Sequence, residues 1–481
     1  MSEVKPTAVV LGGSLAGLLA ARALATAGAR VTVVERDALP AGPEPRRGLP
    51  QAGHVHQLWS GGARALEDLL PGARAALSAA GVRRVPMTTD MVALSAHGWY
   101  RRWPESAFML AAGRDLLDWV VRELVLADDA IELLDRTEAL GLTGTGRAVT
   151  GVRVRADGTG RTLDAALVVD ATGRGSRASH WLAGLGLPEP ERREVDSGLS
   201  YASRLFRAPE GARDRFPVVS IEAEREGSGF GRGGVLLPVE DGRWLVTLIG
   251  GRTDEPPATG AEFLRYAHEE LRHPLIGELL THAEPLTEVT VTRTTANRRV
   301  FPERSPRWPE HFVILGDALC ALNPVYGHGM SVAARSAVAL REVVRRRGGL
   351  GAPGLARRAQ RAVARTVRTA WDLATGADVF YPGATPTGPT VRDRLVSAYV
   401  GRLLLTATGN GRVARRVTDV ISLEAGAEAL LAPRMLLAAA VGPLRPPLSG
   451  PPLTREERTA AAGGGVVGVD AARRDVHPQQ A

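Results

Sequence analysis

The sequence predicts an α/β fold in which a parallel-sheet domain is interleaved with an antiparallel β-sheet domain and followed by a C-terminal helical region. Three observations support this prediction. The chain begins with a strand–helix–strand unit around a glycine-rich turn, a later segment alternates apolar and polar residues as antiparallel strands do, and a second strand–helix unit follows that segment. A chain of 481 residues is long enough for about three domain-sized units.

The first unit has the pattern of a dinucleotide-binding site. An apolar strand at 7–11 runs through a turn of small residues into a helix, and a second apolar strand at 31–34 ends on an acidic residue. The helix N-terminus offers unpaired N–H groups to a pyrophosphate, and a carboxylate after the second strand accepts from ribose hydroxyls. The sequence therefore predicts a Rossmann-like unit. Its candidate cofactor-binding residues are Gly12, Gly13, Ser14, Gly17, Glu35 and Arg36.

A second motif lies far along the chain, at the end of a predicted strand at 312–315. Gly316 and Asp317 follow this strand, and Gly327 and Gly329 precede a long helix. A carboxylate at the carboxyl end of a strand faces the crevice of an open α/β sheet, where it accepts from a polyol hydroxyl. The two later glycines let backbone N–H groups approach a ring or an anion. A second contact this far along the chain fits FAD, with its ribityl chain and isoalloxazine ring, better than NAD.

Between the two motifs the pattern becomes antiparallel. Strands are predicted at 199–207, 218–224, 234–239 and 243–250, with a hairpin turn at 240–242. Arginine-rich helical sequence comes after the second motif, and proline and glycine then recur without a period. The predicted organisation is a FAD-binding domain at 1–90, 113–195 and 296–350, a substrate-binding β domain at 91–112 and 196–295, a C-terminal helical region at 351–441 and a mobile tail at 442–481.

The formal net charge of +8 does not indicate a nucleic-acid partner. Lys5 is the only lysine, so almost all the positive charge is arginine. These arginines are scattered among acidic residues and form no stripe interleaved with aromatic residues. We therefore expect no nucleic-acid binding.

The cysteine and histidine content argues against a disulfide or a metal site. Cys320 is the only cysteine, which rules out an internal disulfide and a thiolate cluster. His54, His56 and His328 have no cysteines or carboxylates near them at the spacing of metal ligands. We expect no metal.

The sequence also predicts a cytoplasmic protein without stable membrane insertion. No signal-peptide pattern precedes the first strand, and no apolar run reaches the ~18 residues that a membrane span needs. The short apolar stretch at 435–441 could graze a membrane, but we favour its interpretation as a buried helix.

Taken together, the two glycine motifs resemble those of FAD-dependent monooxygenases of the aromatic-hydroxylase type, over about residues 5–350. The Asp-Gly element of that family is only loosely matched at 170–173. Further stretches resemble the flavin epoxidases of polyether ionophore biosynthesis, of the monensin and lasalocid type. These stretches are 46–56, 58–64, 113–119, 196–209 and 323–331.

The resemblance implies an epoxidase that acts on alkenes of a linear polyene polyketide in polyether antibiotic biosynthesis. It implies O₂ as co-substrate, a flavin C4a-hydroperoxide as the oxidant, and NADPH or a partner flavin reductase as electron source. An alkene has no acidic proton to remove, so no catalytic acid or base is assigned. The implied flavin-face candidates are Pro324, Tyr326 and His328, and the cationic candidates for the FAD phosphates or ribityl chain are Arg46, Arg47 and Arg114.

Three other functions fit the same scaffold. They are an aromatic hydroxylase, a polyketide cyclase that keeps FAD without a redox step, and a flavin reductase of isoprenoid double bonds. The predicted β domain also holds the aromatic residues with which a pocket for an apolar substrate could be lined, namely Trp99, Tyr100, Trp103, Tyr201, Phe206 and Trp244.

Overall fold

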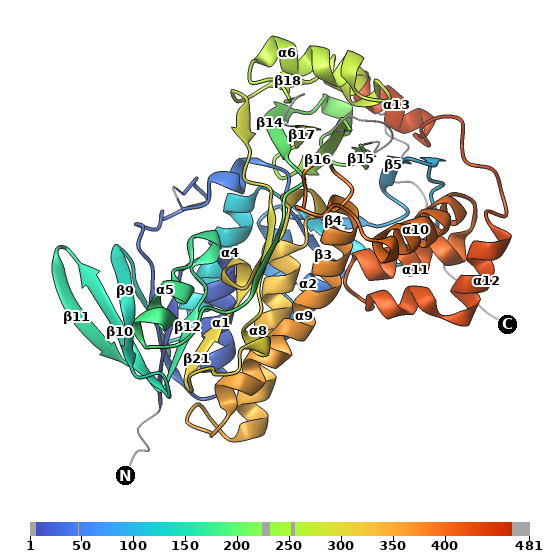
Figure 1. Ribbon diagram of the computed structural model, residues 1–481. Helices are drawn as coiled ribbons and strands as arrows, with labels where there is room; N and C mark the ends of the chain where they lie inside the picture. Colours follow the sequence, from blue (N-terminus) through green and yellow to red (C-terminus); the bar gives the residue numbers. More distant parts are fainter. Residues whose placement is uncertain (1–5, 47, 224–230, 252–254, 464–481) are drawn as a thin grey trace, which may run out of the picture.

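The computed structural model describes residues 6–46, 48–223, 231–251 and 255–463 (Figure 1). Its nucleotide domain is built on a five-stranded sheet in which all neighbours are parallel. This one sheet contains strands from before the β domain in the sequence and a strand, β21, from after it. The predicted interleaving and the fold class are therefore confirmed. The order is β21 (Phe312–Ile314), β12 (Leu167–Asp170), β1 (Thr7–Leu11), β2 (Arg30–Val34) and β8 (Ile131–Leu134).

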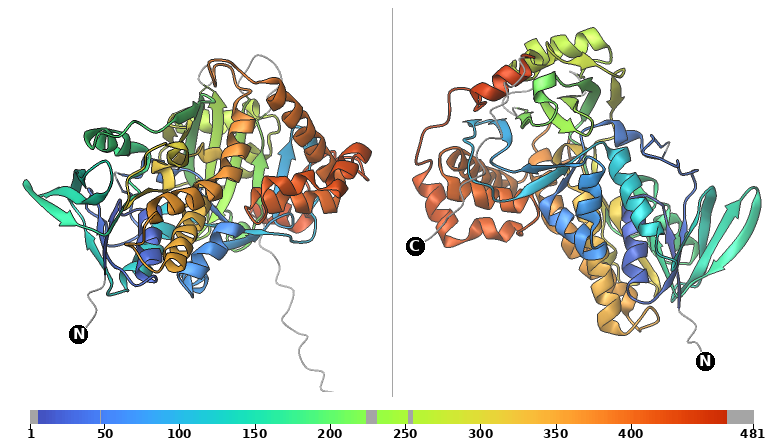
Figure 2. Two further views of the ribbon diagram at one scale, coloured as in Figure 1. Left: turned by 60° about the horizontal axis from the view of Figure 1, so that its bottom comes forward. Right: turned by 180° about the vertical axis from the view of Figure 1, so that it is seen from behind.

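Helices from distant segments pack around α1, which is buried because its sequence is apolar on almost every side. Leu18, Leu19 and Leu24 of α1 are fully buried. Three helices pack directly against α1 (Leu15–Ala25), namely α2 (Ser60–Leu69), α4 (Arg114–Leu126) and α8 (Gly329–Arg347) (Figures 1 and 2). The next helices outwards are α3 (Ala73–Ala79), which packs on α2 and α4, and α9 (Leu355–Asp378), which packs on α8.

Two smaller sheets and a short helix complete the nucleotide domain. An antiparallel sheet of three strands projects at one edge of the molecule (Figure 1). It consists of β9 (Thr137–Gly144), β10 (Val149–Ala156) and β11 (Thr159–Asp164), and α5 (Ala178–Gly184) lies beside it; the other sheet holds β13 (Arg192–Val195), β20 (Asn297–Val300) and β22 (Cys320–Ala321).

The β domain is one eight-stranded sheet, antiparallel except where β15 pairs with β5. The four strands predicted after residue 196 are present. The path is β18 (Glu284–Pro285), β14 (Leu199–Arg207), β17 (Arg243–Gly251), β16 (Gly233–Val239), β15 (Val218–Ile221), β5 (Met91–Ser95) and β6 (Gly98–Trp99), with β19 (Thr290–Thr292) also paired to β14.

The predicted segment 91–112 divides between two sheets. β7 (Phe108–Ala111) does not join the β domain but pairs with β3 (Gln57–Trp59) and β4 (Arg83–Pro86). Its alternate residues enter two cores: Phe108 packs in the nucleotide domain and Met109 packs under the β-domain sheet. A strand buried on both faces shows no polar alternation, so its sequence could not assign it to one domain.

The outer face of the large sheet packs against short helices. Phe206, Trp244 and Trp99 belong to this outer core, which lies away from the nucleotide domain. Tyr201 points to the opposite side, where it packs with Ile249 and Tyr381. The covering helices are α6 (Gly260–Arg265), which is continued to residue 270 by a wider turn, and α7 (Leu275–Leu280).

The C-terminal helices form a separate cluster at one end of the molecule (Figure 1). None of the helices within the described ranges is long and apolar enough to cross a bilayer. The cluster contains α10 (Val391–Gly409), α11 (Gly411–Ile421) and α12 (Pro433–Val441).

The predicted mobile tail is wrong for its described part. α13 (Arg455–Ala461) begins with a capping box between Thr454 and Glu457, and Ala460 and Ala461 are buried in the outer core of the β domain. Glu457 also forms a bidentate ion pair with Arg102, in which the two N–O distances are 2.8 and 2.9 Å. The threonine–glutamate spacing is a local helix-start signal, and the prediction, which rested on the surrounding proline and glycine, did not use it. Residues 464–481 of the predicted tail lie outside the described residues.

Candidate cofactor site

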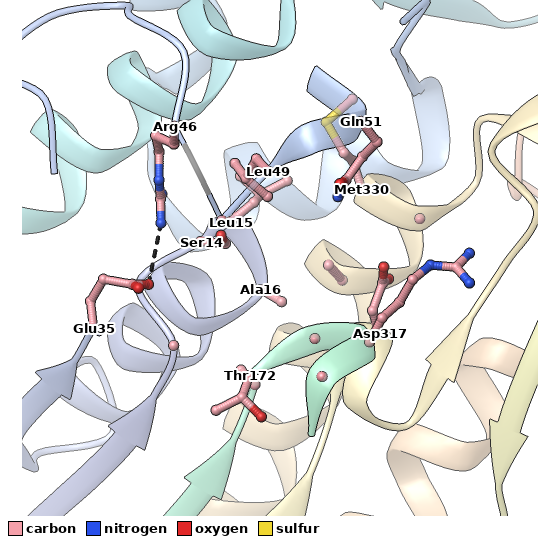
Figure 3. A pocket seen from close by; sticks show the side chains of 18 of the residues that line it. Ser14, Leu15, Ala16, Glu35, Arg46, Leu49, Gln51, Thr172, Asp317 and Met330 are labelled. Atoms are coloured by element: carbon pink, nitrogen blue, oxygen red, sulfur yellow. Dashed lines mark hydrogen bonds and ion pairs between the residues drawn. The ribbon is translucent and has the colours of Figure 1, made fainter. Parts of the chain in front are cut away.

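A cavity of about 450 Å³ opens at the carboxyl ends of β1, β12 and β21 (Figure 3). Leu11, Ala171 and Asp317 lie in its wall, each at or just after the end of one of these strands. Ligands of open α/β sheets bind at this edge. Both sequence motifs therefore meet at one cavity.

The turn after β1 is shaped by two glycines. Gly12 has φ of +102°, and a Cβ there would lie 2.5 Å from the Ala171 carbonyl oxygen. A Cβ at Gly17 would lie 1.8 Å from the Gly12 carbonyl oxygen, so α1 could not start this close to the turn with a larger residue. This leaves the N-terminus of α1, with Ser14 at its cap, open towards the cavity.

Glu35 is buried beside this turn. Its carboxylate accepts from the backbone N–H groups of Gly13 at 2.7 Å and Asp37 at 3.0 Å. The Arg46 guanidinium lies 3.2 Å from the same carboxylate, as the dashed line in Figure 3 shows. Glu35 is therefore held rigidly at the cavity wall, where a carboxylate can accept from a sugar hydroxyl.

Arg46 extends this contact into a buried ionic network. It also donates to Asp118 at 2.9 Å and to the Gly13 carbonyl at 3.2 Å, and Asp118 accepts from Arg114 at 3.3 Å. The Nε atoms of both arginines are buried and have no hydrogen-bond partner among the described residues. We call Glu35, Arg46, Arg114 and Asp118 the charged end of the cavity. Asp118 was missed from the sequence; its spacing from Arg114 was a signal, but its contact with Arg46 spans 72 residues.

Asp317 lies on the other side of the cavity (Figure 3). Burial raises the pKa of its carboxyl, and the charges of Arg174, Arg114 and Arg298 oppose that shift. Arg174, which the sequence did not single out, donates to the carbonyls of Ala296 at 2.8 Å and Leu322 at 2.6 Å. It therefore ties the turn after β12 to the segment that follows Asp317.

The segment at 323–330, which we call the loop end of the cavity, contains His328, and a second uncharged imidazole, His56, lies elsewhere in the cavity wall. His328 donates from Nε2 to the Ile421 carbonyl at 2.8 Å, and its buried Nδ1 has no partner within the described ranges. Burial lowers the pKa of His328 to about 4. His56, also in the cavity wall, donates from Nδ1 to the His54 carbonyl at 2.8 Å. Burial, together with the Arg114 charge, lowers the pKa of His56 to about 3.

Tyr326 does not line the cavity, in contrast to the expectation from the sequence. Its hydroxyl donates to Asp378, a fully buried residue at the end of α9, and its ring stacks on His328 with centroids 6.5 Å apart. Asp378 also accepts from the side-chain amides of Asn323 at 2.9 Å and Asn297 at 2.7 Å. Tyr326 thus ties the loop to α9 on the side away from the cavity.

Most of the predicted site residues line this one cavity. Gly13, Gly17 and Gly316 are buried and do not line the cavity, and Arg47 lies outside the described residues. The predicted residues that line it are Gly12, Ser14, Glu35, Arg36, Arg46, Arg114, Asp317, Pro324, Gly327, His328 and Gly329.

These groups fit FAD. The small-residue turn and open helix N-terminus suit a pyrophosphate, the Glu35 carboxylate suits a ribose, and Asp317 suits a polyol chain. The unpartnered Nε atoms of Arg46 and Arg114 are donors close to the phosphate turn, and the unpartnered Nδ1 of His328 is an acceptor at the loop end. A dinucleotide with a long polar chain and a ring would meet matching groups along the whole cavity.

Comparison with known proteins agrees with this fit. The model of a family described as FAD dependent oxidoreductase matches residues 8–186. Protein Rv3254 of Mycobacterium tuberculosis is 33% identical over 395 residues, which cover 79% of this chain and 82% of that protein. The chain belongs to the family of FAD-dependent oxidoreductases.

Two further similarities are more distant. Kynurenine 3-monooxygenase of Salinispora arenicola is 28% identical over 361 residues, which cover 71% of this chain and 73% of that enzyme. A triple mutant of the flavin-dependent brominase Bmp2 superposes with a TM-score of 0.65 over 90% of this chain and 99% of its own. At 14% identity, the likeness to the brominase is one of fold.

Proposed function

We propose that this protein is a FAD-dependent monooxygenase that epoxidises alkenes of a linear polyene polyketide, in polyether antibiotic biosynthesis. The similarity to kynurenine 3-monooxygenase supports a monooxygenase reaction. The substrate class rests on the resemblance of several stretches, among them 46–56 and 323–331, to the epoxidases of that pathway.

The observation that favours an alkene over a phenol is the state of the two imidazoles in the cavity wall. A phenol must lose its proton to become reactive, and an effective general base has a pKa near the working pH. The pKa of His56 is lowered to about 3 and that of His328 to about 4, both mainly by burial. Both side chains are therefore neutral and weakly basic near pH 7. An alkene needs no base, so this environment suits it.

The chain's own residues bind and orient the reactants. FAD, when bound and reduced, supplies the activation of O₂ for oxygen transfer. Glu35 and Asp317 would hold it by accepting from its hydroxyl groups, and the α8 N-terminus, which opens to the cavity at Gly329, would stabilise negative charge at that end. Pro324 and the neutral His328 add no charge at this end. NADPH, directly or through a partner flavin reductase, supplies the electrons.

The test is accurate-mass analysis of the product formed by the FAD-loaded protein from a linear polyene polyketide or surrogate, NADPH and air. Parallel reactions omit NADPH, exclude O₂, or add a flavin reductase. We expect a gain of one or more oxygen atoms that requires both O₂ and a reductant, with fragmentation that places oxygen at former alkenes.

Other outcomes would replace the proposal. An isomer of unchanged mass, formed in every reaction, would identify a cyclase that keeps FAD without a redox step. Oxygen gained by a phenol offered in competition, and not by the polyene, would identify an aromatic hydroxylase. Added hydrogen without oxygen would identify a double-bond reductase.

A further inference from the structure

Helix α12 is apolar on two opposite faces. Met435 and Ala439, one turn apart, are buried in the core of the C-terminal helices. On the opposite face Leu436, Leu437 and Val441 are 48%, 67% and 64% exposed. The prediction of a buried helix at 435–441 is therefore wrong for the outer face, because apolarity alone does not say on how many sides a short helix is covered.

Exposed apolar side chains also flank the helix in the sequence on both sides. Leu431, just before α12, is 60% exposed, and Leu444, just after it, is 70% exposed. Together with Leu436, Leu437 and Val441 they form what we call the α12 surface. Contiguous exposed apolar patches mark interaction sites in soluble proteins. α12 is also at the outer edge of the molecule, away from the nucleotide domain, in Figure 1 and in the right view of Figure 2.

The charge around the α12 surface is positive. Arg434 and Arg445 are exposed at its two ends, and the sequence has no acidic residue between Glu428 and Glu456. Leucines on one face combined with flanking arginines are typical of segments that lie in the headgroup region of an anionic bilayer. Each arginine near such a surface adds on the order of fivefold to the binding constant.

Two other occupants fit less well. A second copy related by a two-fold axis would face the same patch and bring the arginines at its ends close to their own copies, like charge against like charge. A protein partner is recognised mainly through aromatic and hydrogen-bonding groups, and the five side chains of the α12 surface are all aliphatic. A lipid surface can be bound by aliphatic side chains and flanking arginines alone, which the α12 surface has.

We propose that the α12 surface docks the protein on anionic lipid bilayers, with its aliphatic side chains in the headgroup region and Arg434 and Arg445 against the lipid phosphates. The docking is peripheral. It is independent of the reaction proposed above, so its test is a binding measurement that needs no substrate.

The test is sedimentation of the full-length FAD-loaded protein with vesicles of phosphatidylcholine alone, or of equal parts phosphatidylcholine and phosphatidylglycerol. We expect binding to the anionic vesicles that weakens as salt is added. The variant Leu436→Ser/Leu437→Ser/Val441→Ser should bind the anionic vesicles at least about tenfold more weakly than the unchanged protein. Arg434→Glu/Arg445→Glu should lose about tenfold or more on anionic vesicles only. Because all five residues are exposed, circular dichroism and the flavin content should stay unchanged.

The matched control is Leu395→Ser/Val396→Ser, which removes two exposed apolar side chains from α10, 68% and 51% exposed. It should bind vesicles like the unchanged protein. Equal loss in this control, equal binding of all variants, or no binding to anionic vesicles would overturn the proposal. So would a dimer in light scattering that the α12 triple variant dissociates, because it would identify a second copy as the occupant.

Discussion

The two ends of the cofactor cavity are stabilised in different ways. The charged end is a buried ionic network whose members lie within residues 35–118, inside the nucleotide domain. At the loop end, amide and hydroxyl donors surround the carboxylate of Asp378, and His328 donates to the Ile421 carbonyl at the end of α11. One end is thus built inside the nucleotide domain, and the other depends on helices that follow the second motif.

Because of this difference, we expect FAD retention to depend on the charged end and the conformation of the loop at 323–330 to depend on the C-terminal helices. Glu35 and Arg46 are fixed by neighbours in the same domain, so the site for the ADP part is formed without the C-terminal helices. The loop at 323–330 is held by Asp378 at the end of α9 and by Ile421 at the end of α11. A change in those helices should reach the loop end and leave the charged end unchanged.

The largest effect is expected from Asp118→Ala. This substitution leaves Arg114 without its ion-pair partner and Arg46 with Glu35 alone, in a buried setting. Breaking a buried ion pair from one side costs about 3–5 kcal/mol, so the free energy of unfolding in urea should fall by that amount. Glu105→Ala removes an exposed pair with Arg84 and should cost about 1 kcal/mol or less. Equal losses in the two variants would show that the network does not stabilise the fold.

The next effect is a loss of stability with falling pH, and it tests the loop end. Burial lowers the pKa of His328 to about 4, below the usual 6.5. Between these values the unfolded chain binds a proton that the folded chain does not, so stability is full above about 6.5 and falls by about 1.4 kcal/mol per pH unit towards 4. His54, with its pKa also lowered to about 4 by burial, contributes in the same window.

His328→Gln keeps an amide donor for the Ile421 carbonyl and removes this titration. Urea unfolding at pH 7, 6 and 5 should therefore show a shallower loss of stability in the variant, by about 1.4 kcal/mol per unit. Parallel pH profiles for the variant and the unchanged protein would mean that His328 is not held neutral by burial.

The charged end was largely predictable and the loop end was not. Gly12 and Glu35 belong to one strand–helix–strand unit whose hydrophobic period and small residues can be read directly. Asp317 could be placed because a strand end implies a position at the crevice. In contrast, Asp378 is one of two aspartates in an arginine-rich helix, and nothing local shows that it faces Asn323, 55 residues away.

The same reasoning explains the errors in the fold. Period-2 alternation predicts a strand but not which core each of its faces joins, so Trp244 and Tyr201 could not be told apart although they lie on opposite faces of the sheet. β7 and α12 are apolar segments whose covering partners come from elsewhere in the chain. Sequence patterns indicate which residues of one element are buried. Which element covers them is decided by contacts between segments that are distant in the sequence.

Asp317→Ala should have a smaller effect that is confined to the cofactor. Removing a desolvated carboxylate relieves the burial that raises its pKa, so the fold should stay intact. The loss of a hydrogen bond to the polyol chain should weaken FAD binding about tenfold. Flavin content after purification and titration of the apoprotein by flavin fluorescence measure this. Asp372→Ala on α9, outside the cavity, is the control, and full flavin occupancy in Asp317→Ala would contradict the assignment.

The smallest effect, from Tyr326→Phe, tests whether the loop end depends on the helices behind it. The substitution removes one hydrogen bond to Asp378 and should cost about 0.5–1.5 kcal/mol of stability. Tyr399→Phe is a matched control, because the Tyr399 hydroxyl donates to the Leu430 carbonyl within the C-terminal helices, at 2.6 Å. Both variants should unfold at slightly lower urea concentration. Only Tyr326→Phe should also shift the absorption spectrum of bound flavin, because only Tyr326 belongs to the loop that lines the cavity; identical spectra in both variants would mean that Asp378 stabilises the fold without positioning the loop.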